Sequence, residues 1–309
     1  MEEVRDVKLR KGMTLNELID VYREIHGFMA AHLVKAVEIL KKMMLEADVR
    51  ILTFTANLVA TGLRGILAQL IESRKFNVVI TTAGAIDHDI ARSFGGKYFK
   101  GEFDVDDGEL YQRGIHRLGN VFIPVTNYGP IIEQKLFALL DVILQENDGK
   151  NSWGIRELLH EIGKRIQDQN SILRAAAIAN VPIFVPGFLD GAFGTSLFIY
   201  SRFRKLVIDV FKDEQELADI IFHSKKLGAL IIGGGISKHH AIWWAQFREG
   251  LDYVVYITTA VEWDGSLSGA RPKEAVSWGK VRRDAHSVVV YADATLVLPI
   301  IAYHIMFPT

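Results

Sequence analysis

Short apolar runs rich in β-branched residues recur along the chain and alternate with longer segments that have helical spacing. The runs at 49–55 and 77–82 predict two strands, with one helix filling the interval between them. Three later runs, at 229–232, 252–257 and 287–291, also predict strands, and each is followed by small or polar residues. Strands that alternate with helices predict an α/β fold that is doubly wound, with a mostly parallel, Rossmann-like sheet.

The beginning of the chain predicts an N-terminal helical extension. A charged arm runs up to Thr14, whose position three residues before Glu17 fits a helix capping box. A second helix, separated from the first near Gly27, is predicted by apolar residues at helical spacing, namely Leu33, Val37, Leu40 and Met44. We expect these helices to pack against the body of the protein or against a partner subunit.

The middle of the chain predicts a mixture of loops and amphipathic helices. Residues 95–128 are rich in glycine and acidic residues and favour loops around a short helix and a strand at 121–123. Two amphipathic helices are predicted within 130–146 and 155–168, separated by a turn. A further strand at 181–185 resumes the earlier pattern.

The composition limits the kind of protein this is. Of its 309 residues 49% are hydrophobic, which is enough for a buried core. Because the sequence contains no linker, we predict a single domain over residues 1–309, in which residues 1–45 form the N-terminal arm and helices. A net charge of −1 argues against nucleic-acid binding, and no apolar run approaches the ~18 residues of a membrane span. The absence of cysteine excludes disulfides and thiolate chemistry. We therefore expect a cytoplasmic protein.

The ends of the last three predicted strands predict a binding crevice, because the carboxyl ends of parallel strands meet at one edge of a sheet. The segments at these ends are 233–235, 258–259 and 293–294. The loop between the last two strands combines acids, an aromatic residue and a lysine, namely Glu262, Asp264, Glu274, Trp278 and Lys280. This mixture suits a cationic substrate and an amine nucleophile.

Three long motifs follow one another in this region. They read GGGxxKHH at 233–240, DGSxSGARP at 264–272 and EAVSWGK at 274–280. Further segments upstream belong to the same pattern: TANLVATG (55–62), TTAG (81–84), GEF (101–103), RLGN (117–120) and VPIFVPGFLDG (181–191). In this order and spacing the motifs resemble the deoxyhypusine synthase family over most of the chain, and its archaeal members more than its eukaryotic ones.

The resemblance implies NAD as the cofactor. The residues alone leave this open, because the strand–turn–helix unit at 49–73 lacks the G-x-G-x-x-G fingerprint. A tight strand exit at 82–84 and a helix N-cap at Asp190 are the simpler interpretations of two of the segments. The positions that match the family's NAD site are Ala56, Asn57, Leu58, Val59, Ala60, Thr82, Ala83, Gly84, Asp190, Thr259, Ala260, Asp293 and Ala294.

The resemblance also implies the chemistry. An unactivated C–N bond breaks only after the adjacent carbon has been oxidised, which requires a hydride acceptor and a base. The family uses the residue matching His239 near the reacting amine of spermidine. It uses the lysine matching Lys280 to carry the butylimine to a lysine of the translation initiation factor 5A precursor. NAD is not consumed, and family members are homotetramers, so we expect a homotetramer here.

The polyamine site matches the family only in part. The positions that the resemblance assigns to the substrate are Asp87, His88, Gly234, Tyr256, Asp264, Gly265, Ser266, Glu274 and Trp278. Thr195, Leu267 and His88 stand where well-studied eukaryotic members have acids, and Trp243 replaces an asparagine. The preference among polyamines therefore stays open, as does the question of which other acids compensate.

Other interpretations remain at this point. Asp87, His88 and Asp89 suggest a metal site at first sight, but successive helical residues do not share a face, so we expect no metal. A related enzyme could pass the aminobutyl group to a free diamine, forming homospermidine. A catalytically silent, NAD-binding regulatory paralogue is the third possibility, although such paralogues lack the lysine that this chain has at position 280.

Overall fold

The computed structural model describes residues 3–150 and 152–308, which divide into two compact units. Unit 1 comprises Met1–Phe54, Lys75–Val78 and Ala218–Thr309, and unit 2 comprises Thr55–Arg74 and Val79–Leu217. The start of the predicted N-terminal arm and Asn151 of the predicted turn lie outside the described residues. The single domain predicted from the sequence stays a prediction.

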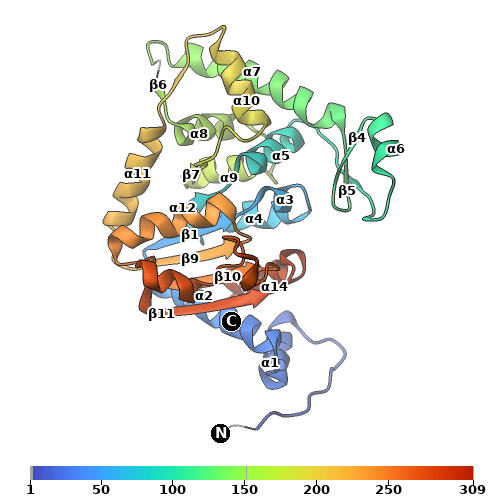
Figure 1. Cartoon of the computed structure of the whole chain (residues 1–309), viewed down its shortest axis with the longest axis vertical. Helices are drawn as coiled ribbons and strands as arrows, with labels where there is room; N and C mark the ends of the chain where they lie inside the picture. The colour runs from blue at the N-terminus through green and yellow to red at the C-terminus, as the bar shows by residue number, and fades with distance from the viewer. Residues whose placement is uncertain (1–2, 151, 309) are drawn as a thin grey trace. The chain divides into compact units, whose positions relative to one another are not determined.

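Four parallel strands form the sheet of unit 1 (Figure 1). Strand β9 pairs with β1 on one side and with β10 on the other, and β11 pairs with β10. The bounds are β1 (Val49–Phe54), β9 (Leu227–Ile232), β10 (Leu251–Thr258) and β11 (Val281–Tyr291). All six residues of β9 are buried, as expected for a parallel strand covered on both faces. The four predicted strands are confirmed, although β11 begins earlier than its apolar run.

Helices of unit 1 cover this sheet. They are α1 (Leu15–Ile25), α2 (Met29–Glu46), α12 (Gly235–Ala245), α13 (Pro272–Ala275) and α14 (Ala294–Met306), with 3-10 turns η2 (Gln246–Arg248), η3 (Glu262–Asp264) and η4 (Val276–Trp278). The predicted capping box is confirmed, since the Glu17 amide donates to Thr14 Oγ1 at 3.2 Å and the Thr14 amide to Glu17 Oε2 at 2.7 Å. Helix α2 packs so closely on β9 that a Cβ at Gly228 would lie 2.3 Å from Met43 Sδ.

Unit 2 is built around α5 (Ala83–Ser93), most of whose residues are buried. Strand β2 (Val78–Ile80) pairs in parallel with β7 (Ile183–Phe184). The other helices are α3 (Ala56–Val59), α4 (Leu63–Glu72), α6 (Asp107–Gln112), η1 (Val125–Asn127), α7 (Gly129–Glu146), α8 (Ile155–Arg165), α9 (Ile172–Ala179), α10 (Ala192–Ser201) and α11 (Val210–Phe222), which ends in unit 1. The prediction of one continuous helix before β2 was wrong, because the chain breaks at 60–62 between α3 and α4.

Two small sheets complete unit 2. The first is antiparallel with strand order β3-β5-β4, where β3 is Phe99–Lys100, β4 is Ile115–Leu118 and β5 is Val121–Pro124. The second pairs β6 (Ser152–Trp153) with β8 (Val207–Ile208) in parallel. The predicted α/β class, with a mostly parallel sheet and N-terminal helices, is confirmed. Among the described residues, none of the helices has the length and apolar character needed to cross a bilayer.

Candidate active site

A cavity of about 330 Å³ lies within unit 1. Its walls are mostly apolar and come from α12, the central strands and the segment that leads into β11: Ile231, Ile242, Trp243, Val254, Leu267, Ala270, Pro272, Ala275, Trp278 and Val281. The polar and charged lining residues are Lys238, His239, Arg271, Glu274 and Lys280. Apolar walls with a few polar groups are typical of a site that binds a small molecule. Four residues predicted from the sequence, His239, Glu274, Trp278 and Lys280, are brought together here.

The backbone of Lys280 is held on both sides. Gly279 adopts a left-handed conformation with φ of 68° and ends the turn η4, so that Lys280 directly precedes β11. The Lys280 amide donates to the Ala275 carbonyl at 3.0 Å, and its carbonyl accepts from the Leu251 amide at 3.1 Å. The lysine therefore projects from a fixed point between α13 and β10.

The side chain of Lys280 lies between two tryptophan rings. Its Nζ is 5.1 Å from the centre of the Trp278 ring and 5.5 Å from that of Trp243. Both rings are exposed, whereas Lys280 itself is only 8% exposed. Indole faces stabilise an ammonium by cation–π attraction and keep water from it. The amine thus lies near two aromatic rings that line the same cavity.

His239 lies on α12, one turn before Trp243. The imidazole stacks on the Trp243 ring, with centroids 5.7 Å apart and an interplanar angle of 28°. Burial lowers the pKa of His239, and the positive charge of Lys280 lowers it further. Because the neutral imidazole is favoured, His239 is suited to accept a proton near the lysine.

Lys238, which sequence reasoning did not single out, is the most buried charged residue of the cavity lining, at 3% exposure. Its Nζ donates to the carbonyls of Leu267, at 2.7 Å, and Ala270, and lies 3.9 Å from the centre of the Tyr256 ring. Burial lowers the pKa of Lys238 to about 8, while the charge of Glu274 opposes this shift. Its place in the GGGxxKHH motif was the only signal in the sequence. The ammonium ties the 267–270 segment to α12.

Among the described residues that line the cavity, Glu274 is the only acid. It lies on α13, a helix of four residues that begins with Pro272. Glu262 instead pairs with Arg271, whose Nε lies 2.6 Å from Glu262 Oε2. Glu274 is exposed and lines the cavity, so of the acids in this region it is the one that can meet a cationic group there.

The other substrate positions predicted in unit 1 surround the cavity without lining it. The Ser266 hydroxyl and, second to it, the Ser266 amide lower the pKa of Asp264, and the amide donates to Asp264 Oδ1 at 2.7 Å. Gly265 has φ of 70°, which the left-handed turn requires. A Cβ at Gly234 would lie 2.2 Å from Ser268 Oγ, so this loop packs directly on the start of α12.

In unit 2, three of the segments predicted to bind the cofactor converge. A Cβ at Gly84 would lie 2.9 Å from the Cβ of Ala56, and one at Gly191 would lie 3.1 Å from the Cβ of Ala83. Thr82, the N-cap of α5, has a buried Oγ1 that finds no hydrogen-bond partner among the described residues. Small residues beside an unsatisfied hydroxyl leave room and hydrogen-bonding capacity for a ligand.

Asp190 and the unit 1 positions lie near the ends of helices and strands. The helix-cap interpretation of Asp190 is wrong, since Gly191 is the N-cap of α10 and Asp190 is exposed. In unit 1, Asp293 caps α14 by accepting from the Thr295 amide at 2.7 Å, with Ala294 as its first residue. Thr259 and Ala260 follow β10 directly. In unit 2, Asn57, Leu58, Val59 and Ala60 form or end α3.

The carboxylates of Asp87 and Asp89 cap two different helices of unit 2. Asp87 accepts from the amides of Ala192 and Phe193, at 2.9 and 2.7 Å, and so caps α10. The Tyr128 hydroxyl donates to the same carboxylate at 2.9 Å. Burial raises the pKa of Asp87. Three donors already bind this carboxylate, and its predicted contact with substrate stays a prediction.

Asp89 caps α9, accepting from the amides of Ile172 and Leu173 at 3.1 and 3.0 Å. It also pairs with Arg64 Nε at 2.6 Å and accepts from the Ser171 hydroxyl at 2.7 Å. The acid is completely buried. Across residues 3–150 and 152–308, no three histidine, cysteine or acidic side chains are grouped as metal ligands.

The positions that depart from the eukaryotic pattern have different surroundings. Leu267 and Trp243 line the cavity of unit 1. In unit 2, Thr195 is exposed on α10. His88 is buried, with its Nδ1 2.8 Å from the Tyr98 hydroxyl, and burial lowers its pKa to about 4. An imidazole with this pKa is neutral at physiological pH and supplies no charge to bind or repel a polyamine.

Comparisons with known proteins give one consistent result. The sequence model of the deoxyhypusine synthase family matches residues 17–305. A curated relative from Aeropyrum pernix, named "Probable deoxyhypusine synthase", is 58% identical and the match covers 98% of each chain. One of the same name from Sulfolobus acidocaldarius is also 58% identical, over 97% of this chain and 95% of the relative. A crystal structure of a protein assigned to the deoxyhypusine synthases, from Entamoeba histolytica, aligns with a TM-score of 0.63 at 25% identity and covers 96% of this chain and 95% of that one.

Proposed function

Because the chain belongs to the deoxyhypusine synthase family, we propose that it is a transferase that moves the 4-aminobutyl group of spermidine to a lysine of the translation initiation factor 5A precursor. The observation that carries this proposal is that the amine of Lys280 lies near the rings of Trp243 and Trp278, and that Trp243 also stacks on the half-buried His239. An amine nucleophile, a neutral base and one acid share a cavity with apolar walls. These are the groups that transfer of an alkylamine requires.

The cavity suits the ends and the middle of a polyamine differently. Glu274 is the anchor for an ammonium group of spermidine, since a charge-assisted hydrogen bond to an acid contributes roughly 1.5–3 kcal/mol. The apolar walls, among them Leu267 and Ile242, contact the methylene chain. The ammonium of Lys238 donates to the backbone carbonyls of Leu267 and Ala270, so Glu274 is left to bind the ammonium group of spermidine.

His239 acts as the base. Its lowered pKa leaves the imidazole neutral at physiological pH, so that it accepts the proton of the secondary ammonium of spermidine. The resulting free amine has the lone pair that is needed before the carbon next to it can be oxidised. Trp243 holds the imidazole ring in one plane through its stacking contact.

Lys280 captures the aminobutyl group. Its amine attacks the carbon of the oxidised substrate, a new C–N bond forms, and the bond to the diaminopropane part breaks as that amine leaves with a proton. The lysine of the acceptor protein then attacks the same carbon and releases the Lys280 amine unchanged. Reduction of the transferred imine completes the product.

NAD, when bound, accepts a hydride from the carbon next to the secondary amine and returns it to the final imine. Two features of unit 2 fit such a cofactor: the close approach of Gly84 to Ala56 and the unpartnered Oγ1 of Thr82. A bound hydroxyl or phosphate oxygen would satisfy Thr82, and a larger residue than Gly84 would fill the space. The matching positions of unit 1, Thr259 and Asp293 among them, are assigned to NAD by the resemblance.

Assembly and location are part of the same proposal. Family resemblance leads us to propose a homotetramer with closed symmetry, which light scattering at micromolar concentration tests directly. A monomeric mass would count against it. The cytoplasmic location predicted from the sequence stays a prediction.

One set of assays distinguishes the candidate functions. The protein is incubated with spermidine and NAD, and with either the translation initiation factor 5A precursor or putrescine. Modification of the factor's lysine supports the proposal, whereas homospermidine formed without modification of the factor supports the free-diamine alternative. A protein that binds NAD but forms neither product would be the silent paralogue.

A further inference from the structure

Gly250 ends the segment that carries His239. Helix α12 continues through η2 into a turn in which Glu249 and Gly250 have φ of 65° and 91°. The Gly250 amide donates to the Ala245 carbonyl at 2.8 Å, which closes the helix end. A left-handed glycine after a helix is a common helix stop, and this role alone would explain why the residue is glycine.

Gly250 also lies directly against the backbone around Lys280. A Cβ at this position would lie 2.9 Å from the Gly279 carbonyl oxygen and 2.9 Å from the carbonyl carbons of both Lys280 and Val281. All three atoms are backbone atoms, so no side chain could rotate away to make room. Next to this contact, the Leu251 amide donates to the Lys280 carbonyl at 3.1 Å.

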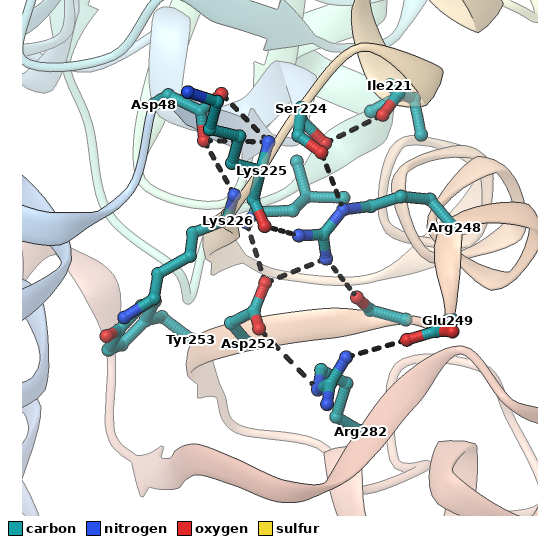
Figure 2. Close-up of polar contacts among 12 residues, drawn as sticks. Asp48, Ile221, Ser224, Lys225, Lys226, Arg248, Glu249, Asp252, Tyr253 and Arg282 are labelled. Carbon is teal, nitrogen blue, oxygen red and sulfur yellow. Dashed lines mark hydrogen bonds and ion pairs between the residues drawn. The ribbon is translucent and has the colours of Figure 1, made fainter.

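A network of charged groups fixes the turn from the other side (Figure 2). Arg248 Nη1 donates to the Gly250 carbonyl at 3.2 Å and to Asp252 Oδ2 at 2.8 Å. Its Nε donates to the Ser224 carbonyl at 3.1 Å, and its Nη2 to the Lys225 carbonyl. The guanidinium therefore ties the turn to the chain that precedes β9, and Gly250 cannot move freely away from Lys280.

We propose that Gly250 is a positioning residue for Lys280: the absence of its side chain sets how closely the helix that carries His239 approaches the segment that carries the lysine. A side chain at 250 has to push the 279–281 backbone outward, because Arg248 holds the turn. The amine then moves relative to His239 and to the carbon it attacks. This inference rests on the proposed role of Lys280 as the carrier of the aminobutyl group.

The test compares two glycine-to-alanine variants at positions with similar positive φ. Gly250→Ala and Gly95→Ala both place alanine at a left-handed position, since φ is 91° at Gly250 and 97° at Gly95, but a Cβ at Gly95 meets nothing within 4 Å. The rate at which spermidine-derived label is captured on Lys280 is measured by borohydride trapping in the presence of NAD. A misplacement of ~1 Å costs on the order of 100-fold in a reaction of this kind.

We expect Gly250→Ala to lower the capture rate at least about tenfold while the spermidine KM stays within about twofold, and Gly95→Ala to capture at the wild-type rate. Equal loss in both variants, or capture by Gly250→Ala at the wild-type rate, would overturn the inference. If wild-type protein carries no label on Lys280, the proposed function fails instead, so the two failures are distinct.

A second variant covers the case in which Gly250→Ala does not fold. Arg248→Lys keeps the charge beside Asp252 but lacks the geometry to reach the carbonyls of Gly250 and Ser224 as well. We expect it to lower the capture rate in the same direction, with NAD affinity unchanged. If Gly250→Ala does not fold and folded Arg248→Lys captures the label at the wild-type rate, the positioning role is rejected. Gly250 would then serve only to end the helix.

Discussion

The Nζ atom of Lys280 lies 5.5 Å from the centre of the Trp243 ring. The same ring stacks on the imidazole of His239. Trp243 therefore contacts both the base and the amine. In eukaryotic relatives the corresponding residue is expected to be asparagine, which offers neither an aromatic face nor the same exclusion of water. The tryptophan contributes to the burial that lowers the pKa of His239.

Replacing Trp243 should shift the pH dependence of catalysis. In Trp243→Ala, water reaches His239 and the burial that lowers its pKa is reduced, so the pKa rises toward its ordinary value. Since the neutral imidazole is the active form, the acidic limb of the kcat/KM profile should move to higher pH. Trp243→Phe, which keeps an aromatic face, is the control. An unchanged acidic limb in the alanine variant would contradict the assignment of His239 as the base.

Removing the charge of Glu274 should weaken spermidine binding selectively. We expect Glu274→Gln to raise the spermidine KM at least about tenfold, which corresponds to ~1.4 kcal/mol, with NAD binding nearly unchanged. Asp264→Asn should act in the same direction only if Asp264 replaces a missing acid. Glu133→Gln, on an exposed position of α7, serves as the control. Wild-type spermidine kinetics in Glu274→Gln would show that the polyamine lies elsewhere.

Lys238 should make stability depend on pH. The pKa of Lys238 is about 8 in the folded protein and near 10.5 in an unfolded chain. Below pH 8 both states are protonated and the cost of burying the charge is fully present. Between about pH 8 and 10.5 the folded state loses its proton first, so unfolding free energy should rise with pH relative to Lys238→Met. Denaturant titrations of both proteins across this range measure the difference, and parallel pH profiles would refute it.

Asp89 should contribute to stability rather than to metal binding. Asp89→Asn removes the charge that pairs with buried Arg64 and weakens the cap of α9, so we expect a loss of about 3 kcal/mol in unfolding free energy. Asp20→Asn, at an exposed site 4.0 Å from Arg23, should change stability little. Chelators should leave the wild-type melting temperature unchanged. A metal-dependent melting temperature, or equal effects of both substitutions, would contradict this role.

The strands were predictable because parallel strands buried on both faces leave continuous apolar runs in the sequence. β9 is the clearest case. The break between α3 and α4 was missed because a single glycine, Gly62, does not by itself end a helical pattern. In the structure a distant residue binds the chain at the break, since Arg92 Nη1 donates to the carbonyls of Val59 and Thr61 at 2.8 and 2.6 Å. The start of β11 was missed for a related reason: its first residues, such as Arg282 and Asp284, are charged and pair with each other at 3.2 Å.

The candidate site was predictable where long motifs resemble a known family, and less so where a contact joins distant segments. Nothing local indicates that the Lys238 ammonium is enclosed by carbonyls about thirty residues later. Asp87 caps a helix that begins about a hundred residues downstream. Such partners are fixed by the fold rather than by spacing along the chain, so the sequence pattern alone favours a surface role for these charges.

The most direct test of the account is to identify the residue that carries the aminobutyl group. Wild-type protein is incubated with labelled spermidine and NAD, reduced with borohydride, digested and analysed by peptide mass spectrometry, beside Lys280→Ala and Lys238→Met. We predict label on Lys280 in the wild type and in Lys238→Met, and none in Lys280→Ala, which retains some oxidation of spermidine. Label on Lys238 or on any other lysine would contradict the assignment of Lys280 as the nucleophile.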